Sequence, residues 1–197
     1  MVIEESGLKF QFSENARALK YDDTKFYRNF VNHMPRAKGV DFLSVYDGSL
    51  VFTEVKNCKG QEAENNWRIQ PDNRKRDTSH TSTDVTGRES LDIEVAEKTA
   101  MTIAGLIGAY SKASFTETAE ILADYAKAMV SDKMRNGKSR ILVILFLEGD
   151  FGCETRRKPA IMRALEDSIR KKLHWLNCNV SVVDSDTYQK KVFELIS

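Results

Sequence analysis

The sequence has few cysteines and histidines, and it has no apolar run long enough to span a membrane. It contains only 3 cysteines, 3 histidines and 3 prolines among 197 residues, and neither the cysteines nor the histidines are closely spaced. This argues against a disulfide framework and against a structural zinc site. Apolar runs such as residues 141–147 are too short to cross a bilayer, and the N-terminal residues lack a basic region followed by an apolar one. We therefore expect a cytoplasmic protein with no membrane partner.

The sequence also lacks an excess of charge of either sign. Lysine and arginine number 30 and aspartate and glutamate 29, which gives a formal net charge of +1. A polyanion would therefore have to be bound by local placement of charge, because there is no global attractive field. With 41% hydrophobic residues, the chain is long enough to form one well-covered domain over residues 1–197.

Residues 38–60, KGVDFLSVYDGSLVFTEVKNCKG, predict a β-hairpin. Asp47-Gly48 separates two β-rich runs and is typical of a two-residue type I′ turn. Such a turn places Tyr46 opposite Ser49 and thereby fixes the register of the whole hairpin.

This register brings three charged side chains together at the open end of the hairpin. Counting back from the turn places Asp41 directly opposite Glu54, at a non-hydrogen-bonded position where Cα atoms are about 4.5 Å apart. Lys56 lies two residues beyond Glu54 and projects from the same face. Two opposed carboxylates repel each other unless a cation neutralises them or one of them takes up a proton. All-oxygen ligation favours a hard ion such as Mg²⁺ or Mn²⁺, which suggests metal-assisted phosphodiester hydrolysis.

The rest of the chain predicts an α/β fold with a mixed sheet, in which an antiparallel hairpin joins parallel strands through helical crossovers. A long polar loop is expected at about residues 57–89, since this stretch is as polar as a linker. Strands are expected at 140–150 and 178–184. Helices are expected within 13–34 with Ser13 and Thr24 as N-caps, from Ser90 onward, at 116–134, at 158–174 and at the C-terminus.

Asp41, a gap of twelve residues and then Glu54-Val55-Lys56 resemble the D…(D/E)-x-K signature of the PD-(D/E)XK nuclease superfamily. The resemblance implies a restriction-endonuclease-like core. It also implies that Asp41 and Glu54 bind a divalent metal together with the backbone carbonyl of Val55, and that Lys56 assists attack on the phosphate. Val40 stands where the signature has proline, and many members of the superfamily also lack this proline.

An acidic residue near the first helix often joins such sites, which leaves Glu14, Asp22 and Asp23 as alternatives. The hairpin and the segment EVAEKTAMTIAGLIGAY are also similar to a group of uncharacterised bacterial proteins built around the same hairpin.

Two further patterns suggest partners. Arg74, Lys75 and Arg76 could follow a nucleic-acid backbone, although neighbouring acids also fit a solvated loop. A stripe of small residues in the predicted helix after Ser90 is consistent with packing inside the domain or with a homodimer seam. The stripe consists of Ala100, Ala104 and Gly108.

From these features we expect a cytoplasmic, magnesium-dependent deoxyribonuclease that uses Asp41, Glu54 and Lys56. The main alternative is a non-catalytic interaction or DNA-binding module with a nuclease fold, which could be a subunit of a defence or mobile-element system with a protein partner. A simpler interpretation of the three residues is an ordinary ion pair at a solvated strand end.

Overall fold

The hairpin around Asp47-Gly48 lies in the middle of a five-stranded sheet. In the computed structural model, which describes residues 1–76 and 85–196, strands β4 (Phe42–Tyr46) and β5 (Ser49–Asn57) pair antiparallel with Tyr46 opposite Ser49. Asp47 and Gly48 have φ angles of 46° and 72°, as both central residues of a type I′ turn require. The predicted turn and register are confirmed.

The sheet is mixed, as predicted. On one side of the hairpin, β3 (Arg17–Lys20) pairs antiparallel with β4. On the other side, β8 (Ile141–Glu148) pairs parallel with β5, and β9 (Cys178–Val183) pairs parallel with β8. The resulting strand order is β3-β4-β5-β8-β9. Parallel neighbours need long crossovers, and helices supply them between β5 and β8 and between β8 and β9.

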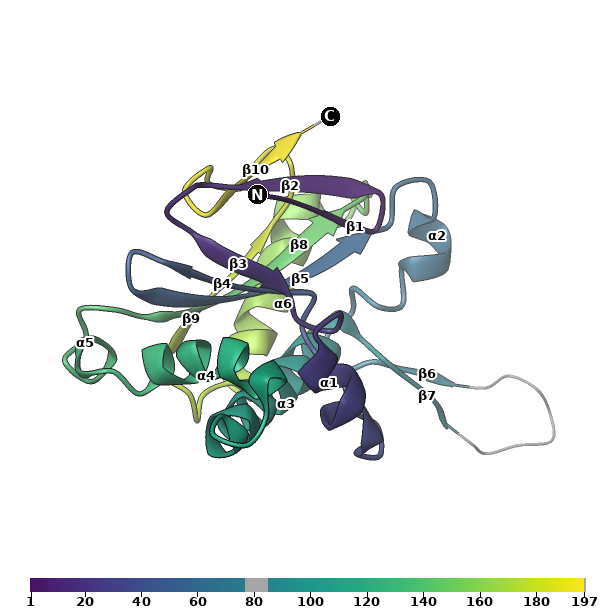
Figure 1. Cartoon of the computed structure of the whole chain (residues 1–197). Helices are drawn as coiled ribbons and strands as arrows, with labels where there is room; N and C mark the ends of the chain where they lie inside the picture. Colours follow the sequence, from purple (N-terminus) through teal and green to yellow (C-terminus); the bar gives the residue numbers. More distant parts are fainter. Residues whose placement is uncertain (77–84, 197) are drawn as a thin grey trace.

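Helices cover one face of this sheet (Figure 1). None of those that the structure describes is long and apolar enough to cross a membrane. The helices with side chains buried against this face are α1 (Lys25–Asn29), α3 (Leu91–Lys112), α4 (Glu117–Met129) and α6 (Lys158–Lys172). The shorter 3₁₀ helix η1 (Val31–His33) and helices α2 (Glu62–Asn65) and α5 (Asp132–Arg135) bury no side chain.

A second, three-stranded antiparallel sheet covers the other face, so that the protein has three layers (Figure 1). It consists of β1 (Val2–Glu5), β2 (Leu8–Phe12) and β10 (Phe193–Ile196) in the order β1-β2-β10. Because side chains alternate along a strand, Leu43 and Phe52 pack against the helices while Phe42 and Val51 pack against this second sheet.

Two of the predicted helices are strands. The C-terminal residues form β10 because Phe193 pairs with Phe12 in β2 and its ring lies 5.1 Å from that of Phe10. Residues 17–20, within the predicted helical stretch 13–34, form β3 because they extend the sheet beside β4. The helix cap at Thr24 is confirmed, since its side chain accepts a hydrogen bond from the Tyr27 N–H at 3.2 Å.

The polar segment at 57–89 has structure of its own. It carries α2 and a two-stranded ribbon of β6 (Arg74–Arg76) and β7 (Val85–Glu89), which projects from the body beside α3 (Figure 1). Residues 77–84 lie outside the described part of the chain. The ribbon leads directly into α3, and this helix borders the site predicted from the hairpin.

Candidate functional site

The strand β5 extends past the end of β4 and leaves one edge open where the predicted residues lie. The ladder between the two strands ends at Phe42 opposite Thr53, and the same register places Asp41 beside Glu54. The Asp41 Oδ2 atom accepts a hydrogen bond from the Val55 N–H at 2.7 Å, in place of the missing backbone partner. The backbone carbonyl of Val55 faces the same open edge, since the N–H and C=O of one strand residue point the same way.

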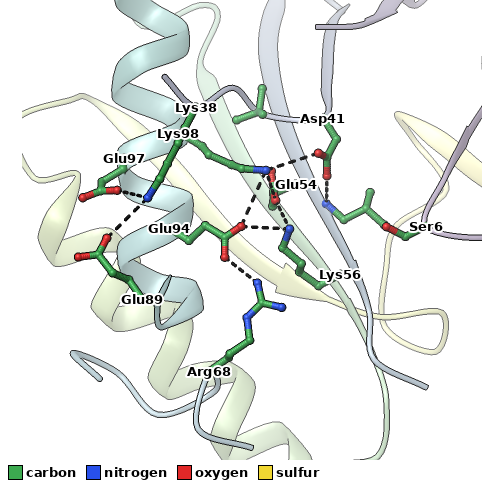
Figure 2. Close-up of polar contacts among 12 residues, drawn as sticks. Ser6, Lys38, Asp41, Glu54, Lys56, Arg68, Glu89, Glu94, Glu97 and Lys98 are labelled. Carbon is green, nitrogen blue, oxygen red and sulfur yellow. Dashed lines mark hydrogen bonds and ion pairs between the residues drawn. The ribbon is translucent and has the colours of Figure 1, made fainter. Parts of the chain in front are cut away.

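Asp41, Glu54 and Lys56 converge as the sequence predicted, and a second lysine joins them (Figure 2). The Lys56 Nζ atom lies 2.5 Å from Glu54 Oε1. The Lys98 Nζ atom lies 2.6 Å from the same oxygen and 3.6 Å from Asp41 Oδ1. The two carboxylates therefore share the ammonium of Lys98.

Three side chains from outside the hairpin belong to the ion-pair network, and the sequence did not predict them there: Lys98, Glu94 and Arg68. Glu94 Oε1 lies 3.1 Å from the Lys56 Nζ atom, and Glu94 Oε2 lies 2.6 Å from an Arg68 guanidinium nitrogen. Glu94 and Lys98 lie one turn apart on the otherwise largely apolar helix α3. Their i,i+4 spacing on a buried helix was the signal available in the sequence.

The start of α3 is fixed in place by a second buried network. The Asp92 carboxylate accepts hydrogen bonds from Ser90 Oγ at 2.5 Å, from Ser168 Oγ at 2.8 Å and from Lys172 Nζ at 2.7 Å. These contacts join the first turn of α3 to α6, which holds Glu94 and Lys98 against the sheet.

Burial changes the acid–base behaviour of the two carboxylates. Only 1% of Glu54 is exposed, and burial together with the nearby Asp41 charge raises the pKa of Glu54 to about 7, against the opposing effect of Lys56 and Lys98. Burial also raises the pKa of Asp41, although both lysines oppose this shift. A buried pair of like charges thus favours uptake of a proton or of another cation.

The surrounding charged groups stay ionised. Burial by itself would lower the pKa of Lys56, but the Glu54 and Glu94 charges outweigh it and raise that pKa above its ordinary value. Burial would raise the pKa of Glu94, yet Lys56 and Arg68 lower it to about 2. The pKa of Lys98 is likewise raised, because Glu54 and Asp41 outweigh the effect of burial.

Among the three acidic residues considered near the first helix, Asp22 lies next to the site. The Tyr21 N–H donates a hydrogen bond to the Asp41 carbonyl at 2.9 Å. Asp22 is the next residue along the chain and is therefore close to Asp41. Burial and the Asp41 charge both raise the pKa of Asp22. In contrast, Asp23 forms an exposed ion pair with Arg28, and the exposed Glu14 lines a different hollow near β10.

The donor set fits a hard divalent ion. Glu54 Oε2 is a buried oxygen without a hydrogen-bond partner, and the carboxylate of Asp41 and the carbonyl of Val55 share its strand end. Within residues 1–76 and 85–196, no three His, Cys, Asp or Glu side chains converge closely enough to form a metal site by themselves. Water would have to supply the remaining ligands, as is usual for Mg²⁺.

The other predicted contacts lie away from this network. Arg74 is exposed on β6 and lies 3.3 Å from Glu89, while the side chains of Lys75 and Arg76 belong to the part of the chain whose placement is not described. Ala100 is half-buried, whereas Ala104 is exposed on α3 and a Cβ atom at Gly108 would meet no atom within 4 Å, so the latter two positions do not pack closely inside the described structure.

Comparison with known proteins gives one family. A model of DUF6661, a family of unknown function, matches residues 24–197, which include every residue of the ion-pair network. No curated protein and no solved structure matches the chain.

Proposed function

We propose that this chain, which belongs to the DUF6661 family of unknown function, is a metal-dependent phosphodiesterase that cleaves DNA. The observation that carries the proposal is the pair of buried carboxylates, Asp41 and Glu54, at an open strand end with two lysine ammonium groups. The strand end brings carboxylate oxygens from both strands of the hairpin together beside these ammonium groups. The antiparallel hairpin continued by parallel strands supports a PD-(D/E)XK type of core.

In this proposal the carboxylates of Asp41 and Glu54 and the carbonyl of Val55 would hold the ion, with Asp22 nearby as an additional negative charge. A bound Mg²⁺ or Mn²⁺ would polarise the scissile phosphodiester and activate water. Lys56 remains protonated because Glu54 and Glu94 stabilise its charge. Its role would therefore be to stabilise negative charge on the phosphate rather than to accept a proton.

The ribbon of β6 and β7 offers a surface for the rest of the substrate. It projects beside the N-terminus of α3 and carries the exposed Arg74 (Figure 1). A two-stranded ribbon fits the major groove of duplex DNA, and basic residues on it would contact phosphates. We therefore propose Arg74, Lys75 and Arg76 as residues that position the backbone.

One observation favours a second candidate function, a non-catalytic module that binds nucleic acid or protein. Lys56 and Lys98 already neutralise Asp41 and Glu54, so the cluster is paired without a metal. A buried cluster of paired charges can also serve only to specify the fold. Whether the wild-type protein binds a divalent ion distinguishes between the two candidate functions.

The first test is a calorimetric titration of Mg²⁺ and Mn²⁺ into wild type and Asp41→Asn, with cleavage assays on duplex, branched and single-stranded DNA and on RNA. We expect wild type to bind the ion and to cut, and Asp41→Asn to lose both, because one of two carboxylate ligands is gone. The matched control is Asp23→Asn, since Asp23 is exposed and pairs with Arg28 and Lys20 away from the carboxylate pair, and it should behave like wild type. Absence of ion binding by wild type would favour the non-catalytic module.

Metal binding should depend on pH through Glu54. Its pKa of about 7 in the folded protein lies above the ordinary value of 4.5, so a proton competes with the ion below about pH 7. The same shift means that the contribution of Glu54 to metal-free stability decreases as pH rises from about 4.5 through about 7.

We therefore expect the apparent affinity for Mn²⁺ to be roughly tenfold higher at pH 8 than at pH 6, as a single competing proton requires. Thermal unfolding with and without Mn²⁺ at both pH values measures this, and the Mn²⁺-induced rise in Tm should be larger at pH 8. An equal rise at both pH values would contradict the involvement of Glu54.

A further inference from the structure

We propose that the ammonium of Lys98 is a built-in competitor of the divalent ion: it holds Asp41 and Glu54 together in the metal-free protein and must leave them when the ion binds. This inference rests on the proposed function and deepens it, because it assigns the site a regulatory residue outside the hairpin. Lys98 would set the metal concentration at which the site is filled.

The contacts of Lys98 identify it as the competitor. Among the described residues, Lys98 is the cation that forms ion pairs with both carboxylates, at 2.6 Å from Glu54 Oε1 and 3.6 Å from Asp41 Oδ1. An ion held between the same two carboxylates would lie about 2.1 Å from an oxygen of each. A dication and an ammonium cannot share these oxygens in a buried site, because their mutual repulsion is poorly screened there.

Lys56 is held differently, although it contacts the same Glu54 oxygen. Its ammonium also lies 3.1 Å from Glu94 Oε1, and Arg68 binds the other oxygen of Glu94 (Figure 2). Lys56 can therefore keep a partner while Glu54 binds the ion.

The ammonium of Lys98 can leave the two carboxylates for another partner. Its side chain is 15% exposed, and Glu94, one turn earlier on α3, lies 3.9 Å away as an alternative partner. The lysine side chain has a flexible four-carbon stem, so the ammonium can move toward Glu94 or solvent without movement of the helix. The exchange needs only a change of side-chain rotamer.

Two consequences of opposite sign follow for Lys98→Met, which keeps an unbranched side chain of similar length and removes the ammonium group. Without the ion, the two buried carboxylates lose their shared counter-ion, and the Tm should fall. With the ion, the competitor is gone, and binding should become tighter. A side chain with a purely structural role would lower the Tm without raising the affinity.

The experiment is a calorimetric Mn²⁺ titration at pH 8 of wild type, Lys98→Met and the matched control Lys56→Met, with thermal unfolding of each protein with and without Mn²⁺. We expect Lys98→Met to bind Mn²⁺ at least tenfold more tightly than wild type, with a lower metal-free Tm and a larger Mn²⁺-induced rise. Lys56→Met should gain less than threefold, because it does not vacate the position between the carboxylates. If Lys98→Met does not fold, Lys98→Gln replaces it in every comparison.

The outcomes separate the two proposals. If wild type binds Mn²⁺ and Lys98→Met binds it equally or more weakly, the competitor role is wrong and the proposed function stands. If Lys56→Met gains as much as Lys98→Met, net charge alone sets the affinity and the competitor role is again wrong. If neither wild type nor any lysine variant binds Mn²⁺, the proposed function fails and the inference fails with it. Binding by Lys98→Met alone would support the competitor role, whereas the absence of binding by wild type would count against the proposed function.

Discussion

Glu54→Gln is expected to reduce metal-dependent cleavage by at least about 10³-fold, because it removes the most buried carboxylate that would hold the ion. The fold should survive this change. Glutamine has the shape of glutamate, and with a pKa of about 7 the Glu54 carboxyl is already partly neutral near pH 7. The measurements are kcat/KM on the substrate that wild type cuts, a Mn²⁺ titration, and the circular dichroism spectrum of the variant.

The control for this prediction is Lys56→Met, which removes a charge from the same oxygen of Glu54 without removing a ligand. It should still bind Mn²⁺, whereas its kcat should fall by about 10²- to 10³-fold, the range for loss of one group that stabilises transition-state charge. Cleavage by Glu54→Gln at the wild-type rate would overturn the assigned metal site. Equal loss of ion binding in both variants would contradict the separate role of Lys56.

Gly105→Ala is expected to destabilise the protein by about 2–3 kcal/mol, in the upper part of the usual range for overpacking a buried site. A Cβ atom at Gly105 in α3 would overlap the hydroxyl oxygen of Tyr21, a fully buried side chain. This cost exceeds the helix-propensity gain of about 1 kcal/mol that alanine otherwise brings. Chemical denaturation of wild type and variant measures the free energy of unfolding.

The chain offers both a control and a rescue for this substitution. Gly108 lies in the same helix, and a Cβ atom there would have no neighbour within 4 Å, so Gly108→Ala should stabilise the protein by up to about 1 kcal/mol. Tyr21→Phe removes a hydroxyl that has no hydrogen-bond partner, and it should recover most of the loss in the Gly105→Ala background. Failure of this rescue would show that the clash is not with the hydroxyl of Tyr21.

The same contact connects stability to the site. Tyr21 donates its backbone N–H to the carbonyl of Asp41, so a shift of Tyr21 would also move the residue proposed to bind the ion. Packing of α3 against Tyr21 therefore helps to hold Asp41 in place, in addition to the pairing within the hairpin.

The hairpin and the pairing of Asp41 with Glu54 could be predicted from the order of the residues alone. Both follow from local chemistry: Asp47-Gly48 selects one turn type, and the turn fixes every pair along β4 and β5. The long apolar pattern of α3 and the parallel strands β8 and β9 were predicted for the same reason, since hydrophobic periodicity over many residues needs no distant partner.

The distant residues that join the pair could not be predicted in this way, because they arrive through tertiary contacts. Glu94 and Lys98 approach it because α3 packs across the sheet, and Asp22 rather than Glu14 lies beside it because β3 extends the sheet next to β4. The C-terminal strand was missed because it forms by pairing with β2, nearly the whole chain length away. Turn chemistry acts between neighbours in the sequence, whereas strand addition and helix packing depend on contacts that no short segment contains.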